Sequence, residues 1–192
     1  MRAFAHTAAA APQLGADDAA DKPATKVATE SPMNPDVRSM LTEDQLAVLR
    51  GSYRRAVMDM IATKIVAAPY PPAGALVAFA ADRFYNDAPP VLTQADRERC
   101  LIAIFAAGRR PAFAMAVHVY WGLMEGLTVG EIAEIITLSA LYGGLDVLTD
   151  NNKTLADTLK FLAKTADAGG EAAQSQVVLP ALVNAFRPPI AI

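Results

Sequence analysis

The segment "PAFAMAVHVYWGLMEGLTVGEIAEIITLSALYGG", residues 111–144, decides the fold class of this chain. It opens with Pro111, which suits the first turn of a helix, and continues through an apolar run to a stop at Gly126. Thr128 and Glu131 then have the spacing of a capping box, in which the two residues satisfy each other's backbone N–H groups. The segment therefore predicts two successive helices joined by a short glycine turn.

The same start signal precedes two earlier segments. Thr42 stands three residues before Gln45, and Thr93 stands three residues before Asp96. These signals predict one helix over 42–65 and another that runs to residue 108. Large apolar residues support the first of them because they recur at helical spacing at Leu46, Leu49, Tyr53, Val57, Met60, Ile61 and Ile65.

The rest of the chain completes an all-helical pattern. A short helix is expected over 75–86 and an amphipathic helix over 150–167, followed by a linker over 168–176. Gly143 and Gly144 either kink the second helix of the opening segment or allow a close approach of a neighbour. No segment alternates apolar and polar residues as a strand does, so the fold class is all-α.

Three regions are expected along the sequence. Residues 1–33 carry almost no large apolar side chains and are predicted to form a disordered N-terminal arm. Residues 34–165 are predicted to form one helical domain. Residues 166–192 are predicted to be a linker and an apolar C-terminal tail, laid on another subunit or on the body of the fold.

Three predicted helical segments are apolar on nearly every side: 101–108, 111–124 and 135–145. An exposed helix normally shows one apolar stripe and one polar face. One layer of five or six helices does not supply neighbours for all three segments, so we expect an obligate homo-oligomer. The alternative is a compact monomer with a single, fully central helix.

The composition narrows the classes of partner. Of the 192 residues, 53% are hydrophobic and 19% are charged, with a net charge of −3, and the chain has no basic cluster for nucleic acid. Cys100 is the only cysteine, which excludes an intrachain disulfide and a cysteine-based metal site. Because His6 and His118 are the only histidines, we expect no metal site and no cofactor.

A membrane location is not expected either. The uncharged run over 65–81 contains Pro69, Pro71, Pro72 and Gly74, which break a spanning helix. Residues 1–15 lack the strongly apolar core of a secretory signal. The prediction is therefore a cytoplasmic protein without a membrane partner.

Residues 96–155 carry a resemblance to a known family. An acidic and basic start precedes an apolar helix, and His118 stands in the next helix. A glycine turn then leads into Thr128-x-x-Glu131-Ile132 and, further on, "ALYGG". This order, over about residues 75–160, resembles the carboxymuconolactone decarboxylase-like family, which includes the alkylhydroperoxidase D-like proteins.

The resemblance implies an all-helical bundle of the alkylhydroperoxidase D-like type that assembles as trimers or hexamers. Members either decarboxylate a muconolactone in aromatic compound catabolism or reduce hydroperoxides through a thiol pair, and others have no assigned activity. The peroxidase branch carries Cys-x-x-Cys-x-x-x-His, whereas Pro111 and Ala114 occupy the cysteine positions here. Since a dithiol cycle needs two thiols, that mechanism is excluded.

The decarboxylase branch needs no cysteine, and its chemistry suits the residues present. Loss of CO2 leaves electron density on the lactone that must be protonated, and imidazole groups exchange protons near neutral pH. The resemblance implies His118 and Glu98 as catalytic residues. An arginine, Arg97 or Arg99, would bind the substrate carboxylate. Tyr120 and Trp121, which flank the histidine, would line the substrate pocket.

Alternatives remain for each of these residues. If His118 has no chemical role, it is a core residue with a hydrogen bond. In the same way, Glu98 would be a surface charge and Cys100 a small buried hydrophobe. The favoured function is a carboxy-lyase acting on a small carboxylated, lactone-type substrate. The alternatives are a divergent peroxidase-like redox protein that uses Cys100 alone, and a non-enzymatic oligomer of the same fold that binds a small ligand.

Overall fold

The computed structural model describes residues 36–55, 75, 79 and 91–187, and every structural statement below concerns these residues. They form helices and no strand, which confirms the all-α class. In chain order the elements are η1 (Val37–Ser39), α1 (Glu43–Ser52), α4 (Gln94–Ala107), α5 (Ala112–Met124), α6 (Val129–Gly143), α7 (Leu145–Ala168), η3 (Gly170–Ala173) and α8 (Ser175–Phe186). The predicted arm over 1–33 lies outside the described residues.

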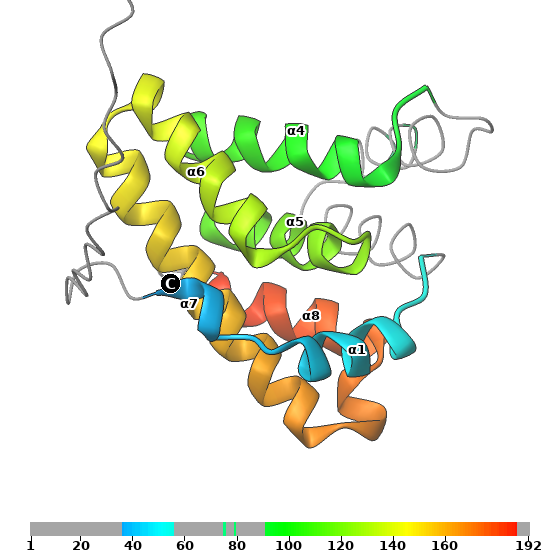
Figure 1. The fold of residues 1–192 in the computed structure, drawn as a ribbon. Coiled ribbons are helices and arrows are strands. Elements are labelled where there is room, and N and C mark those ends of the chain that lie inside the picture. The colour runs from blue at the N-terminus through cyan, green and yellow to red at the C-terminus, as the bar shows by residue number, and fades with distance from the viewer. Residues whose placement is uncertain (1–35, 56–74, 76–78, 80–90, 188–192) are drawn as a thin grey trace, which may run out of the picture.

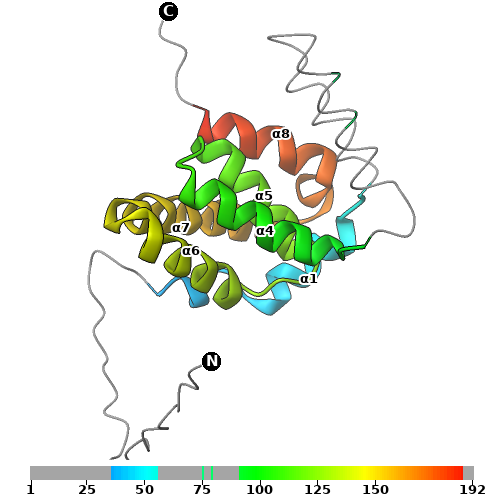
Figure 2. The same cartoon turned by 90° about the horizontal axis from the view of Figure 1, so that it is seen from above.

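Helix α5 is the centre of the fold. It runs between α4 and α6 on one side and α7, α8 and α1 on the others (Figures 1 and 2). Its sequence contains no charged residue, and its buried side chains include Met115, Val119, Tyr120 and Leu123. The helices of this one chain therefore enclose α5, and its all-round apolar character does not by itself require a second subunit.

The predicted helix starts are confirmed in detail. In α1, the Thr42 hydroxyl accepts a hydrogen bond from the Gln45 N–H at 3.2 Å, and the Gln45 side chain accepts one from the Thr42 N–H at 2.9 Å. In α6, Thr128 and Glu131 form the same reciprocal capping box. These caps satisfy backbone donors that a helix leaves open at its first turn, so the local sequence suffices to place them.

The prediction of one helix over 42–65 is wrong, because α1 ends at Ser52. Tyr53 is extended, with φ −72° and ψ 135°. Two long-range contacts hold the chain there: the Tyr53 hydroxyl donates to Glu125, and the Arg54 N–H donates to the Ser175 hydroxyl. Tertiary contacts therefore overrule the helical periodicity at this point. Residues 56–65, and all of the predicted helix over 75–86 except residues 75 and 79, lie outside the described residues.

The break between α6 and α7 depends on two glycines with different roles. Gly144 adopts φ 103°, a backbone conformation that residues with side chains rarely adopt. At Gly143 an added Cβ would lie 2.9 Å from Cγ2 of Val147, so only glycine fits the turn without displacing that side chain. Both predicted roles, a break and a close approach, occur here at neighbouring positions.

The C-terminal part is helical rather than a linker and a tail. The segment predicted as a linker contains η3 and the start of α8. Most of the predicted tail forms α8, which packs on α5 and buries Val178, Leu179 and Leu182. The tail was predicted to lie either on another subunit or on the body of the fold, and in the structure its helical part lies on the body. No helix of the described part is long and apolar enough to cross a membrane.

Candidate functional site

Helix α4 carries Glu98 on its inner side. The Thr93 hydroxyl caps this helix by accepting a hydrogen bond from the Asp96 N–H at 3.1 Å. One row of α4, with residues four positions apart, is buried: Gln94, Glu98, Ile102 and Ala106. Glu98 itself is fully buried, so its interpretation as a surface charge is wrong. A buried carboxylate needs hydrogen-bonding partners, and the next helix provides one.

His118 of α5 is that partner. Its Nδ1 lies 2.8 Å from Oε2 of Glu98, and the side chains of the two residues are 13% and 1% exposed. The two residues that the family resemblance implied as catalytic are therefore in direct contact. His118 is also a well-buried residue with a hydrogen bond, so the packing interpretation and the chemical one describe the same geometry.

The pairing determines which nitrogen of His118 is available for chemistry. An ionised carboxylate only accepts hydrogen bonds, so with Glu98 ionised the proton lies on Nδ1 of the imidazole. Nε2 is then the atom that accepts or releases a proton. The contact with Glu98 fixes the orientation of the ring, as the carboxylate does in a histidine–carboxylate pair.

Two aromatic rings enclose the imidazole. The ring centroid of Trp121 lies 5.0 Å from that of His118, with the planes at 86°, in an edge-to-face arrangement. The ring of Phe105, from α4, lies 4.6 Å away, tilted by 49°. Trp121 thus occupies the predicted place beside His118. Sequence reasoning missed Phe105, although its position seven residues after Glu98 puts both on nearly the same side of α4.

The close approach of α4 and α5 depends on Gly122. An added Cβ at this position would lie 3.2 Å from Cδ1 of Ile102, 3.2 Å from Cδ2 of Leu127 and 3.7 Å from Cβ of Glu98. A larger residue would therefore require the side chains of Ile102 and Leu127, or α4 itself, to shift by a few tenths of an ångström. Any movement of α4 would act on the hydrogen bond between Glu98 and His118, which belong to these two helices.

We expect Gly122→Ala to lower the free energy of unfolding by about 1–3 kcal/mol, the usual cost of overpacking a core. The measurement is urea unfolding followed by circular dichroism. Gly51→Ala on α1 is the matched control, because nothing lies within 4 Å of an added Cβ there. The control should be neutral or more stable by up to about 1 kcal/mol. Equal stabilities for the two variants would contradict the close-approach argument.

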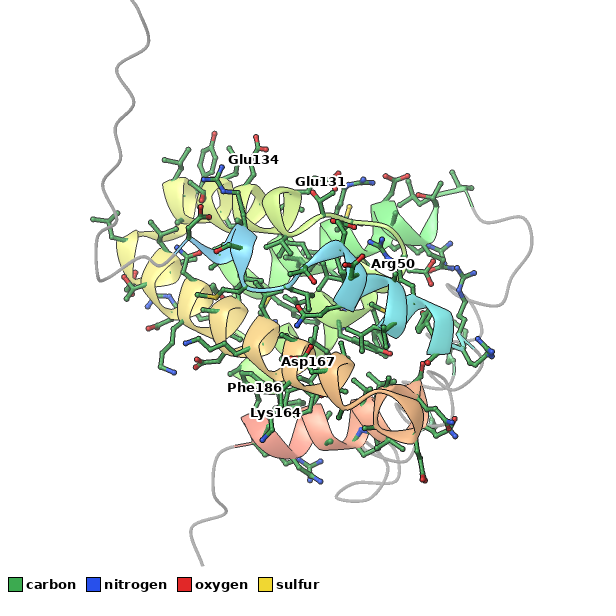
Figure 3. All side chains as sticks on the ribbon, turned by 60° about the horizontal axis from the view of Figure 1, so that its bottom comes forward. Arg50, Glu131, Glu134, Lys164, Asp167 and Phe186 are labelled. Atoms are coloured by element: carbon green, nitrogen blue, oxygen red, sulfur yellow. The ribbon has the colours of Figure 1, made fainter. Side chains whose placement is uncertain are left out.

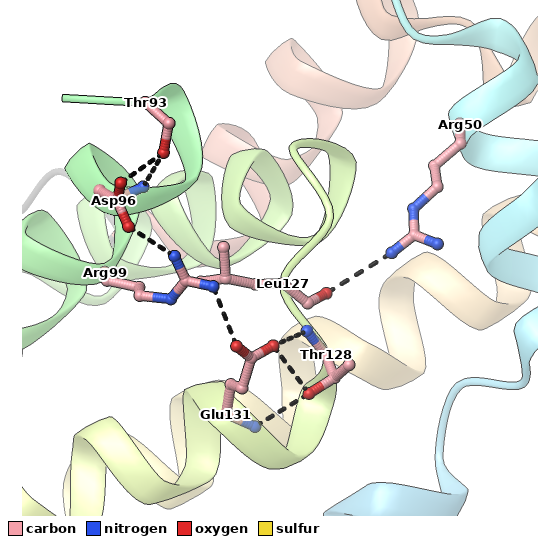
Figure 4. Close-up of polar contacts among 7 residues, drawn as sticks. All are labelled: Arg50, Thr93, Asp96, Arg99, Leu127, Thr128 and Glu131. Atoms are coloured by element: carbon pink, nitrogen blue, oxygen red, sulfur yellow. Dashed lines mark hydrogen bonds and ion pairs between the residues drawn. The ribbon is translucent and has the colours of Figure 1, made fainter. Parts of the chain in front are cut away.

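The two candidate arginines are placed differently. Arg99 donates to Asp96 at 2.7 Å and to Glu131 at 3.0 Å, so its guanidinium lies between α4 and α6 (Figure 4). These two carboxylates raise the pKa of Arg99. No contact between Arg99 and His118 occurs in the described structure. Arg97 is half-buried and directly precedes Glu98 in the chain.

The contacts of Glu131 connect α4 to the start of α6. The Thr128 N–H donates to this carboxylate at 2.8 Å, and Arg99 and the Thr128 hydroxyl donate to it as well. These hydrogen bonds, the backbone one above all, lower the pKa of Glu131. The ionised form is therefore favoured in the folded chain relative to the unfolded one.

We predict a pH-dependent contribution from this carboxylate. A lowered folded-state pKa stabilises the fold above the ordinary glutamate value of about 4.3, and this stabilisation is lost as the pH falls below it. Wild type should therefore exceed Glu131→Gln in stability at pH 7, by less than about 1 kcal/mol because the side chain is partly exposed. The difference should shrink as the pH falls below about 4.3. Urea unfolding at several pH values measures the difference in stability between wild type and Glu131→Gln. Glu171→Gln is the control for the loss of one carboxylate. A difference that does not depend on pH would contradict the prediction.

Tyr120 faces another side of α5. It is fully buried, its hydroxyl donates to the Ser175 hydroxyl at 3.3 Å, and its ring packs edge-on against Tyr53. Burial raises the pKa of Tyr120 to about 12. Burial and the neighbouring Glu125 likewise raise the pKa of Tyr53. The structure therefore places Tyr120 in the packing between α5, α1 and α8, and records no contact between it and His118 in the described part.

Cys100 is exposed, so the prediction of a buried hydrophobe is wrong. It lies on the outer side of α4, away from the buried row that contains Glu98. The described residues contain no group of three or more His, Cys, Asp or Glu side chains that could hold a metal ion.

A cavity of about 650 Å³ opens where the start of α5 meets α7 and the end of α8. Its lining residues are Pro111, Ala112, Lys153, Asp157, Phe161, Ala185, Phe186 and Arg187. No predicted site residue is among them. The candidate site is therefore the buried pair Glu98–His118 with its two aromatic neighbours, and this cavity is a separate feature.

Comparisons of this chain with models of protein families, with curated proteins and with solved structures found no match.

Proposed function

We propose that this chain is a cytoplasmic carboxy-lyase of the carboxymuconolactone decarboxylase type, acting on a small carboxylated lactone. The hydrogen bond of 2.8 Å between His118 and the buried Glu98 is the observation that supports the proposal. A carboxylate removed from water and directed at one imidazole nitrogen leaves the other nitrogen for proton transfer. The order of motifs over residues 96–155 supports the same family.

In the proposed reaction, the bond between the lactone and its carboxylate breaks and CO2 leaves. The electron pair of that bond remains on the lactone, and a proton from Nε2 of His118 then neutralises it at carbon. Glu98 holds Nδ1 and stabilises the imidazolium before the transfer. Arg97, which is half-buried and directly precedes Glu98 in the chain, is the proposed partner of the substrate carboxylate.

We also propose that the bundle is of the alkylhydroperoxidase D-like type and assembles as a homo-oligomer, a trimer or a hexamer. Exposed apolar side chains on α4 and α6 support association: Ile104, Leu138, Leu141 and Tyr142 are all more than half exposed. Exposed groups of this kind mark interaction sites in soluble proteins.

The test is an ultraviolet absorbance assay of muconolactone decarboxylation by the purified wild-type chain. Loss of the substrate chromophore with release of CO2 supports the proposal. The exposure of Cys100 favours one alternative, a single-thiol peroxidase, so peroxide consumption is measured in parallel on wild type and Cys100→Ser. Peroxide turnover that Cys100→Ser abolishes would replace the lyase proposal. No turnover in either assay would favour a ligand-binding oligomer.

A further inference from the structure

The cavity at the meeting point of α5, α7 and the end of α8 has the size of a small-molecule site. Its volume is about 650 Å³, and sites for small molecules usually measure about 300–1,000 Å³. We call it the α7–α8 cavity. Because none of its lining residues belongs to the proposed catalytic site, a ligand here would be additional to the substrate of His118.

Helix α7 contributes one continuous face to this cavity. Lys153, Asp157 and Phe161 follow one another at intervals of four residues, which places them on the same side of a helix, and all three line the cavity. Phe161 is half-buried and packs against the hydrophobic core. This face of α7 therefore presents two charged groups and then an aromatic ring that the core holds in place.

Helix α8 contributes a second ring. Phe186 lies at the end of α8, where this helix runs beside α7 (Figure 3), and it too is half-buried against the core. The neighbouring lining residues Pro111, Ala112 and Ala185 are small and carry no charge. Two aromatic side chains in a wall that is otherwise apolar suit a flat, apolar ligand.

The side chains of the cavity carry an excess of positive charge. The carboxylate of Asp157 pairs with Lys153, and the ammonium group of Lys160 lies 4.0 Å from the same carboxylate. Arg187 is exposed and forms no ion pair with any residue that the structure describes. Its N–H donates to the carbonyl of Val183 at 2.9 Å, which fixes its backbone at the end of α8. A chain with a net charge of −3 thus has a local cationic surface here.

The helix ends do not change this sign. The start of α5 carries partial positive charge and the end of α8 partial negative charge, and both ends reach the cavity, so the two contributions oppose each other. The side chains therefore decide which ligands are favoured. A guanidinium group has the geometry to bind a carboxylate through two parallel hydrogen bonds.

We propose that the α7–α8 cavity binds a small aromatic carboxylate, with its ring against Phe161 and Phe186 and its carboxylate against Arg187. A cationic ligand would face a surface of its own sign, and a neutral one would leave Arg187 without a partner. An inorganic anion would gain nothing from the two rings. This inference rests neither on the reaction proposed for His118 nor on the homo-oligomer.

The first experiment measures binding of 2-naphthoate to the full chain by equilibrium dialysis, followed by the absorbance of the ligand. We expect a dissociation constant on the order of 1 mM or tighter, which is usual for a ligand of this size. The matched ligand is 2-naphthamide, which has the same shape and no charge, and it should bind at least about threefold more weakly. Acetate at the same concentration should not displace 2-naphthoate. Absence of saturable binding of 2-naphthoate would overturn the inference.

Two variants with opposite expected effects locate the ligand. Arg187→Gln should weaken binding of 2-naphthoate about threefold to fivefold, the size typical of a solvent-exposed ion pair. Asp157→Asn removes the one carboxylate of the wall, so it should strengthen binding by up to about fivefold. Neither variant should change binding of 2-naphthamide. Phe161→Leu should weaken binding of both ligands about twofold to tenfold, because both use the ring.

Two further arginines serve as controls. Arg54→Gln should bind 2-naphthoate as wild type does, since the backbone of Arg54 contacts Ser175 at the opposite end of α8. Arg97→Gln should do so as well, because Arg97 belongs to the proposed catalytic site. Circular dichroism establishes that all variants are folded.

Some results would place the ligand elsewhere or change its class. Binding that is lost in Arg97→Gln and kept in Arg187→Gln would put 2-naphthoate at the proposed catalytic site and overturn the inference. Equal affinities for 2-naphthoate and 2-naphthamide would overturn the role of the charge. None of these readouts involves decarboxylation, so each result is independent of the lyase assay.

Discussion

His118→Gln is expected to lower kcat for decarboxylation by about 10²- to 10⁴-fold while the chain remains folded. That range is the usual contribution of a positioned proton donor. Glutamine keeps a polar hydrogen-bond donor in the side chain, but its amide has no group that releases a proton at neutral pH. The substitution therefore separates the chemical role of the imidazole from its structural one.

The measurement is kcat from the absorbance assay, with thermal unfolding of the same sample as the check on folding. Glu98→Gln is the companion variant, since it keeps the shape of the side chain and removes the charge that stabilises the imidazolium. We expect it to lower kcat less than His118→Gln does, because the proton donor is still present. Full activity of a folded His118→Gln protein would remove His118 from the reaction.

The second large effect concerns stability. His118→Leu should lower the free energy of unfolding by about 3 kcal/mol, because the carboxylate of Glu98 then loses the imidazole in a place where water does not replace it. The side chain of Glu98 is 1% exposed. For a chain of this size, that loss corresponds to a decrease in Tm of roughly 6–12 °C.

The double variant Glu98→Leu/His118→Leu is the control. When both members of a buried polar pair become apolar, stability is often recovered in part, because neither member then leaves an uncompensated buried charge. The double variant should therefore be more stable than His118→Leu alone, and a thermodynamic cycle built from both single variants measures the coupling. Additive losses in the cycle would show that the 2.8 Å contact contributes no interaction energy.

The predicted features that the structure contains are local ones. The three predicted helix starts at Thr42, Thr93 and Thr128 are all present, because each depends on residues within one turn. The end of α1 was not predictable in this way. Its periodicity continues to Ile65, but Tyr53 and Arg54 make contacts with Glu125 and Ser175, more than seventy residues away.

The candidate site shows the same division. The family pattern named Glu98 and His118, but α4 is apolar on most sides between Leu101 and Ala107, so its sequence does not define one inner face. The same ambiguity explains why Cys100 was expected to be buried. Likewise, Tyr120 and Trp121 are neighbours in the sequence but lie on different sides of α5. Trp121 packs beside the imidazole of His118, and Tyr120 lies beside α8.

By itself, the sequence determined that the chain is all-α, where its helices start, and that α5 belongs in the interior. These properties follow from caps, periodicity and the absence of charge, which act over a few neighbouring residues. Only the tertiary structure decided that Glu98 meets His118, because their contact requires α4 and α5 to pack against each other with these two residues at the same level. Such an arrangement depends on the packing of side chains distant in the chain, which a one-dimensional pattern does not contain.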